Sequence, residues 1–142
     1  DDDLGPADVV INELLAADAS DGPDWFELYN AGESIADLSG WTVSDEDASP
    51  WGLPDATQLR PGAFLLIYAD NLEGVETDGL HASFKLSKDG ETLTLASQDG
   101  DAGSAVSYPE LRDAEAYART RDGGGEWAIV EEGGTPAAPN AR

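Results

Sequence analysis

The sequence consists of short apolar runs, each closed by a turn signal, and this pattern constrains the fold more than any other feature. Several runs alternate between apolar and polar residues: within 25–30, Phe26 and Leu28 share one face while Glu27 lies on the other. No window carries the apolar stripe of an amphipathic helix. The best helical candidate, residues 109–119, is mostly charged and alanine-rich. The pattern therefore predicts an all-β fold.

The individual runs predict strands at a spacing of about ten residues, which is typical of a two-sheet antiparallel sandwich. We expect them over residues 9–15, 25–30, 38–44, 63–69, 91–96, 105–108 and 127–130. Trp41 and Val43 form the expected inward pair of their strand. The run 63–69 is apolar throughout, which is typical of a strand buried on both faces. Residues 88–90, Lys-Asp-Gly, predict a hairpin-type turn.

The apolar positions of these strands predict a core between two antiparallel sheets. The side chains expected there are Phe26, Leu28, Trp41, Phe64, Leu66, Leu93 and Leu95. A chain of 142 residues is long enough for one domain that buries roughly two-thirds of its unfolded surface. We expect residues 1–7 to form an acidic leader or linker and residues 8–142 to form the domain.

The charge of the chain limits its partners. Thirty acidic residues face seven basic ones, which gives a net charge of −23. Such a field repels phosphate groups, so we expect no nucleic-acid partner and no binding to anionic membranes. No apolar run reaches the roughly 20 residues that span a bilayer, so no membrane insertion is expected. The acidity suits either cation binding or a saline environment that screens the charges.

Residues that could carry catalysis are few. The chain has no cysteine, and His81 is its only histidine. No Gly-x-Ser-x-Gly elbow, phosphate-binding loop or dinucleotide fingerprint occurs. The sequence therefore predicts no catalytic residues, and we expect His81 to be structural or exposed. A hydrolase that uses two of the many carboxylates is the least favoured alternative.

Calcium is the one candidate cofactor, because Ca²⁺ takes six to eight oxygen ligands from flexible loops. The candidate ligands lie in two loops and are Asp18, Asp21, Asp24, Asp45 and Asp47. A third loop offers Asp99, Asp101 and Ser104. None of the loops carries a complete calcium-binding pattern, and aspartate is also common in turns for conformational reasons.

Three tryptophans stand near the ends of expected strands, namely Trp25, Trp51 and Trp127. Exposed aromatic rings in this position line grooves for glycans or peptides. Edge packing is the alternative interpretation of all three side chains.

Several segments resemble one known family. Residues 24–30, Asp-Trp-Phe-Glu-Leu-Tyr-Asn, resemble the Trp-x-Glu-Leu-Tyr-Asn strand of the lamin tail domain family, in its bacterial branch. Residues 37–41, Asp-Leu-Ser-Gly-Trp, are similar to a second segment of that family. Further similarity follows in order at residues 11–14, 59–62, 80–95, 117–119, 127 and 135–140, so that the resemblance covers about nine-tenths of the chain.

The resemblance implies an immunoglobulin-like sandwich, with Phe26, Leu28, Leu38 and Trp41 in the core. It implies that Glu27 and Asn30 are polar residues near strand ends. Bacterial members of the family are typically accessory domains of secreted or surface proteins, and the family has no catalytic residues to transfer. Its animal members bind proteins and chromatin, but the charge of this chain opposes chromatin binding.

These observations together predict a non-catalytic extracellular interaction, adhesion or spacer module within a larger secreted or surface protein. Its partner would be a protein or a glycan. The alternative is a calcium-stabilised domain that binds a glycan or a peptide. We expect an extracellular or cell-surface location, with the targeting signal absent from this segment, which begins at Asp1 without an apolar leader.

Overall fold

The computed structural model describes residues 9–16, 24–45, 50–69, 80–82, 84–87, 89–97, 103–111, 115–123 and 126–130. These residues form strands joined by turns, and no helix occurs among them. None of them therefore provides a helix that is long and apolar enough to cross a membrane. The strands are β1 (Val9–Leu15), β2 (Asp24–Asn30), β3 (Ala36–Asp37), β4 (Thr42–Ser44), β5 (Trp51–Gly52), β6 (Gln58–Leu59), β7 (Phe64–Ala69), β8 (Leu80–His81), β9 (Glu91–Ala96), β10 (Gly103–Tyr108), β11 (Ala116–Arg119) and β12 (Trp127–Val130).

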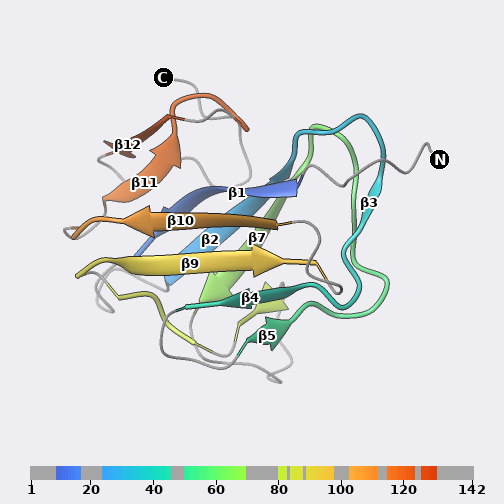
Figure 1. Cartoon of the computed structure of the whole chain (residues 1–142), viewed down its shortest axis with the longest axis horizontal. Helices are drawn as coiled ribbons and strands as arrows, with labels where there is room; N and C mark the ends of the chain where they lie inside the picture. Colours follow the sequence, from blue (N-terminus) through green and yellow to red (C-terminus); the bar gives the residue numbers. More distant parts are fainter. Residues whose placement is uncertain are drawn as a thin grey trace.

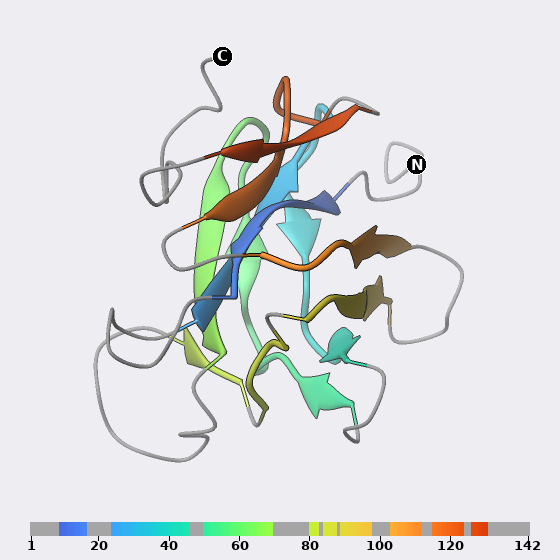
Figure 2. The same ribbon diagram turned by 90° about the vertical axis from the view of Figure 1, so that its left-hand side faces the viewer.

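Two sheets face each other and form the sandwich (Figures 1 and 2). The larger sheet has the strand order β12-β11-β1-β2-β7-β8, and the smaller has the order β10-β9-β4-β5. Strands β3 and β6 form a separate two-stranded ribbon. Every pairing is antiparallel except that of β7 with β8. The predicted all-β, immunoglobulin-like sandwich is confirmed.

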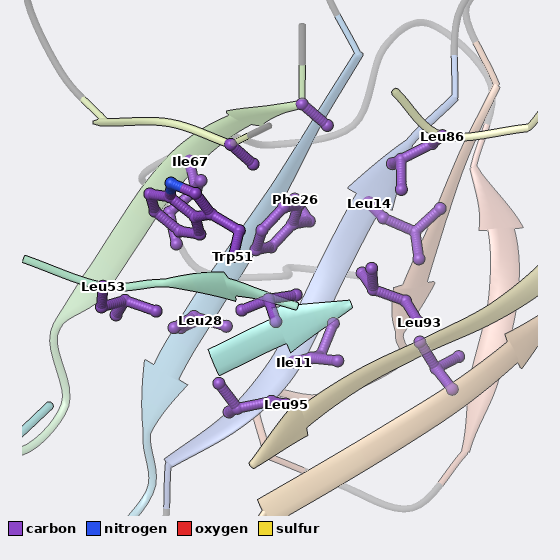
Figure 3. Packing of buried hydrophobic residues seen from close by; sticks show 14 of the residues in the cluster. Ile11, Leu14, Phe26, Leu28, Trp51, Leu53, Ile67, Leu86, Leu93 and Leu95 are labelled. Atoms are coloured by element: carbon purple, nitrogen blue, oxygen red, sulfur yellow. The ribbon is translucent and has the colours of Figure 1, made fainter. Parts of the chain in front are cut away.

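The core lies between the two sheets and comes from alternate residues of each strand, because successive side chains of a strand point to opposite faces. Figure 3 shows Ile11, Phe26 and Leu28 from the large sheet opposite Leu93 and Leu95 from the small one. Of the seven side chains predicted for this core, Phe26, Leu28, Trp41, Leu93 and Leu95 are confirmed as buried.

The prediction was wrong for Phe64 and Leu66, which are only half-buried. Strand β7 faces the core through Leu65, Ile67 and Ala69, as its pairing of Phe26 with Ile67 and of Leu28 with Leu65 requires. An uninterrupted apolar run does not show which parity points inward, so the register with β2 decides the matter. Leu66 instead joins a second apolar cluster on the outer face of the large sheet, built on Leu15, Trp25 and Ala116.

The helical candidate at 109–119 was also wrong in its C-terminal part. Residues 116–119 form β11, which pairs with β1 on one side and with β12 on the other. Alanine is the best helix former, but intrinsic propensity is a weak determinant of structure, and strand pairing on two sides outweighs it here. Ala116 and Ala118 are buried, whereas Tyr117 and Arg119, which alternate with them, are half-buried on the opposite face.

The segment 37–41 is a corner between sheets, so the strand expected over residues 38–44 is shorter than predicted. Gly40 has a φ of 78°, in the left-handed region that favours glycine. Asp37 Oδ1 accepts hydrogen bonds from the backbone N–H of Ser39 at 3.0 Å and from its hydroxyl at 2.7 Å, and these bonds lower the pKa of Asp37. Ser39 Oγ in turn accepts a bond from Ala56 N at 2.7 Å.

Candidate functional site

The predicted calcium ligands are described only in part. Asp24 is the first residue of β2 and is buried, and its Oδ2 accepts a hydrogen bond from Leu86 N at 3.0 Å. This bond fastens the segment that leads into β9 to the start of β2. Asp45 follows β4 and is half-buried. Asp18, Asp21 and Asp47 lie outside the described residues, as do Asp99 and Asp101 of the third loop.

A metal site therefore remains a prediction. Where the structure describes the chain, no three histidine, cysteine, aspartate or glutamate side chains gather closely enough to hold an ion. Ser104, the remaining member of the third loop, has a structural contact instead. Its hydroxyl accepts a hydrogen bond from Ile11 N at 3.3 Å, which links β10 of the small sheet to β1 of the large one.

A hydroxyl and a carboxylate hold the turn before β9. Glu91 Oε2 accepts hydrogen bonds from Ser87 N at 2.7 Å and from the Tyr108 hydroxyl at 3.0 Å. The same hydroxyl lies 2.9 Å from the Ser87 carbonyl oxygen. Burial, and secondly the charge of Glu91, raise the pKa of Tyr108 well above its usual range. The group is thus a neutral hydrogen-bond donor. Gly90, with a φ of 99°, lies in this turn, and its N–H donates to Ser87 O at 3.3 Å. The predicted turn is present where the structure describes it, but it joins no hairpin, because β8 pairs with β7 whereas β9 pairs with β10 and β4.

Asn30 is buried and serves as a clamp rather than as an exposed strand-end residue. Its Nδ2 donates to the carbonyl oxygens of Ser34 at 2.9 Å and Leu59 at 2.8 Å, while its Oδ1 accepts from Gly32 N at 2.9 Å. These bonds hold the turn after β2 against β6. The polar character predicted for Asn30 is correct, and the burial is what sequence reasoning missed.

Glu27 lies in the middle of β2 and is fully buried, on the outer face of the large sheet. It is the cross-strand partner of Glu13 in β1, which is also fully buried. Two carboxyl groups that are buried side by side are costly to ionise together. This juxtaposition was not predicted. The only signal in the sequence is that each of the two strands has a glutamate among the residues that point away from the core.

His81 is half-buried, and its ring stacks on that of Tyr68 with centroids 5.3 Å apart. The two residues are cross-strand partners in β8 and β7, on the outer face of the large sheet.

Of the two interpretations of the three tryptophans, a ligand groove or packing, packing holds for two of them. Trp51 is buried in the main core, and Trp25 is buried in the second apolar cluster. Trp127 differs, because it is half-buried at the start of β12. Its ring stacks on Tyr117 with centroids 5.1 Å apart, and the Arg119 guanidinium carbon lies 4.7 Å from its centroid.

Trp127 belongs to a surface that we call the aromatic ledge, formed by Tyr117, Arg119, Trp127 and Ile129. The register pairs Tyr117 with Ile129 and Arg119 with Trp127, so all four side chains share the face of the large sheet that points toward the core. Arg119 Nε donates a hydrogen bond to Ile11 O at 2.8 Å, and partial burial lowers its pKa. Ile129 is 46% exposed, so the ledge is only partly covered.

The β11–β12 turn is held in place by Asn12, at the bulge where the β1–β2 register shifts. Asn12 Oδ1 accepts from Gly123 N at 2.9 Å, and Asn12 Nδ2 donates to Asp122 Oδ1 at 3.0 Å. Gly123 has a φ of 74°, and a Cβ there would lie 3.1 Å from Ala31 Cβ. A side chain at this position would therefore be strained, so the hairpin is fixed against the end of β2.

Strand β10 lies beside the ledge and forms one end of the small sheet. It pairs with β9 through six consecutive residues without a register shift, and within the described part of the chain β9 is its only strand partner. Gly103, Ala105 and Ser107 are exposed on its outer face. The guanidinium Nη2 of Arg119 lies 3.5 Å from Ser104 Oγ, which joins this strand to the ledge.

The fold and these contacts define a class of protein, the immunoglobulin-like antiparallel sandwich in which polar side chains tie distant backbone segments together. The chain belongs to the lamin tail domain family, whose model matches residues 4–110. Lamin tail domains are immunoglobulin-like and generally non-catalytic. The match ends before β11, so the aromatic ledge lies outside it. No curated protein matches the sequence.

Proposed function

We propose that this chain is a non-catalytic interaction domain of a secreted or cell-surface protein, used for adhesion, anchoring or spacing. One observation carries the proposal: polar side chains that could serve chemistry bond to backbone groups of distant segments. Asp24 binds Leu86 N, Asn30 binds Leu59 O and Ser104 binds Ile11 N. A catalytic site requires such groups to converge on one position for a reacting atom, whereas here they cross-link the fold.

The charge supports a protein partner of the opposite sign. A net charge of −23 keeps an exposed domain soluble and repels other copies of itself. It also attracts cationic partners and speeds their encounter at low ionic strength. The extracellular or cell-surface location is part of this proposal.

Calcium has a stabilising role in this proposal rather than a catalytic one. The acidic segment 18–24 leads directly into Asp24, whose carboxylate already orders the segment before β9. An ion bound there would reinforce the same end of β2. A calcium-stabilised domain could bind a glycan instead of a protein, and Trp127 would then be the accessible aromatic ring.

A paired assay tests the proposal. The purified chain is incubated with chromogenic phosphodiester and glycoside substrates, and is separately coated on beads that are exposed to cationic and anionic proteins. We expect no turnover, and we expect retention of cationic proteins on the beads that falls as salt is added. Turnover that scales with the concentration of the chain and is lost on heat unfolding would overturn the non-catalytic assignment. Beads that retain nothing would overturn the interaction role.

A further inference from the structure

We infer that an extended, cationic segment of another protein adds as a strand to the edge of β10 that no described strand covers, with its inward side chains on the aromatic ledge. This inference rests on the proposed interaction function and specifies where the partner binds and by what chemistry.

The first observation is that the edge of β10 lacks the usual features that protect an edge strand from pairing. A terminal strand presents unpaired N–H and C=O groups, and proteins usually protect such edges by shortness, charge, proline or bulges. Of the other three end strands of the two main sheets, β5 and β8 are two residues long and β12 is four residues long. Strand β10 has six residues, Gly-Ser-Ala-Val-Ser-Tyr, and its register with β9 is unbroken. It carries no charge in a chain of which 26% of the residues are charged.

The second observation is that the facing layer extends further than β10. The large sheet continues past β1 with β11 and β12, whereas the small sheet ends at β10, whose Ser104 contacts Ile11 of β1. In Figures 1 and 2, β11 and β12 lie on the side of β10 that is opposite to β9. Among the described strands of the small sheet, none lies beyond β10 to face them. A strand added about 4.8 Å from β10 would continue the small sheet in that direction.

The ledge supplies the surface against which such a strand would pack. Tyr117 and Trp127 are half-buried, and Ile129 is more exposed than either of them, at 46%. Alternate side chains of an added strand point inward, so apolar residues at every second position would cover these three side chains. The contact between Arg119 and Ser104 places the ledge directly beside the edge. Backbone bonds and apolar contacts are thus available to the same segment.

The charge of the molecule selects the occupant. Pairing of β10 with β10 of a second copy would bring together two domains of net charge −23, which repel each other. A segment with lysine or arginine at its outward positions is instead attracted. The partner is therefore an extended segment in which apolar residues alternate with basic ones and in which proline is absent from the pairing positions.

The first experiment uses a capped synthetic peptide of alternating lysine and valine, with a glutamate and valine peptide as its charge-reversed control. Binding is measured by calorimetry, and amide hydrogen exchange of the whole domain is followed by nuclear magnetic resonance. We expect the lysine peptide to bind and to slow exchange at alternate residues within Gly103–Tyr108. We expect the glutamate peptide not to bind.

Backbone N-methylation separates strand addition from simple charge attraction. Methyl groups on alternate residues block the hydrogen bonds of only one edge of the peptide. We expect methylation of one set of alternate residues to abolish binding. Methylation of the other set should change the dissociation constant by no more than a few-fold. Equal binding of both methylated peptides, or protection spread outside β10, would overturn the edge assignment while leaving the domain a binder of cationic proteins.

The two most exposed isoleucines provide a matched pair of variants. Ile129→Lys changes the ledge, whereas Ile35→Lys makes the same change at a side chain that is 55% exposed and outside the ledge. Both variants should fold, because both side chains are exposed. We expect Ile129→Lys to weaken peptide binding at least tenfold and Ile35→Lys to weaken it less than threefold. Equal effects would overturn the role of the ledge.

Two further outcomes would also overturn the inference. Concentration-dependent protection of β10 without peptide would show that a second copy of the chain occupies the edge. Failure of the lysine peptide to bind, with cationic proteins still retained on the beads, would show that the interaction function stands and that its site lies elsewhere.

Discussion

At the scale of single residues, amides and carboxylates that the sequence marks as polar are buried and hold the backbone. Asn30 joins three backbone groups, Asn12 holds the β11–β12 turn, and Asp24 anchors Leu86. A buried polar group must be hydrogen-bonded, and removal of one partner leaves the other group buried and unsatisfied. These side chains therefore govern stability more strongly than their polar character suggests.

Asn30→Ala tests the clamp. It removes the donor to Ser34 O and to Leu59 O, the latter being a fully buried bond. We expect the free energy of unfolding to fall by about 3 kcal/mol, since each unsatisfied buried group costs roughly 1–3 kcal/mol. Urea unfolding measures the change, and Glu33→Ala, an exposed change in the same turn, should alter stability by no more than about 0.5 kcal/mol. A similar loss in both variants would contradict the clamp.

The facing glutamates predict coupled substitutions. Glu13 and Glu27 are cross-strand partners and both are fully buried, so their side chains share one environment. Each substitution changes the surroundings of the other carboxyl group, so the effects of Glu13→Gln and Glu27→Gln on unfolding should not add. We expect a coupling energy of about 0.5–3 kcal/mol in a double-mutant cycle. In a cycle between Glu27 and the exposed Glu33, the changes in the free energy of unfolding should add. Additive changes in both cycles would contradict this interpretation.

At the scale of elements, hydrogen bonds between neighbouring strands fix the turns of the small sheet. The Tyr108 hydroxyl of β10 reaches across β9 to the turn at Ser87, and Glu91 completes the contact. The turn before β9 thus depends on a residue that follows it by about twenty positions in the sequence.

Tyr108→Phe is expected to cost about 1–2 kcal/mol at neutral pH, because it removes the one hydroxyl proton that Ser87 O and Glu91 Oε2 share as acceptors. The folded pKa of Tyr108 lies above the unfolded value of 10.0, so the unfolded chain releases the proton first as pH rises. The contribution of Tyr108 is therefore complete below pH 10 and is lost progressively above it. Urea unfolding from pH 7 to pH 11 should show a steeper alkaline decline in the parent than in the variant. Parallel declines would contradict the raised pKa.

At the scale of the whole molecule, the net charge of −23 acts against the compact state. Monovalent salt shortens the screening length from about 10 Å at 0.1 M to about 3 Å at 1 M. We expect the melting temperature to rise over this range of sodium chloride concentration. A flat response in calorimetry would show that the charges are compensated locally.

Calcium is separated from general screening by comparison with magnesium in high sodium chloride. A specific site saturated at a hundred times its dissociation constant adds about 2.7 kcal/mol to stability. A flexible carboxylate loop prefers calcium, so we expect a larger shift in melting temperature with calcium and its loss in Asp21→Asn. Equal shifts with both ions, unchanged by the substitution, would leave only a diffuse acidic surface.

The sequence by itself determined the class of fold and those strands in which apolar and polar residues alternate. The period of two placed Phe26 and Leu28 inward in β2 and Leu93 and Leu95 inward in β9, because alternation is a local property of the chain. The turn residues separated these strands, and the motifs at 24–30 and 37–41 indicated the family that the model match confirms.

Only the tertiary structure decided the features that depend on which strands lie next to each other in the sheets. It set the inward parity of the uniformly apolar β7 through pairing with β2, and it made β11 a strand through pairing on both sides. It also brought Glu13 opposite Glu27 and placed the ledge beside β10. Each of these features joins residues that are distant in sequence. Their proximity follows from which strands pair and in which register, and a shift of that register by one residue would turn every side chain of a strand to the other face.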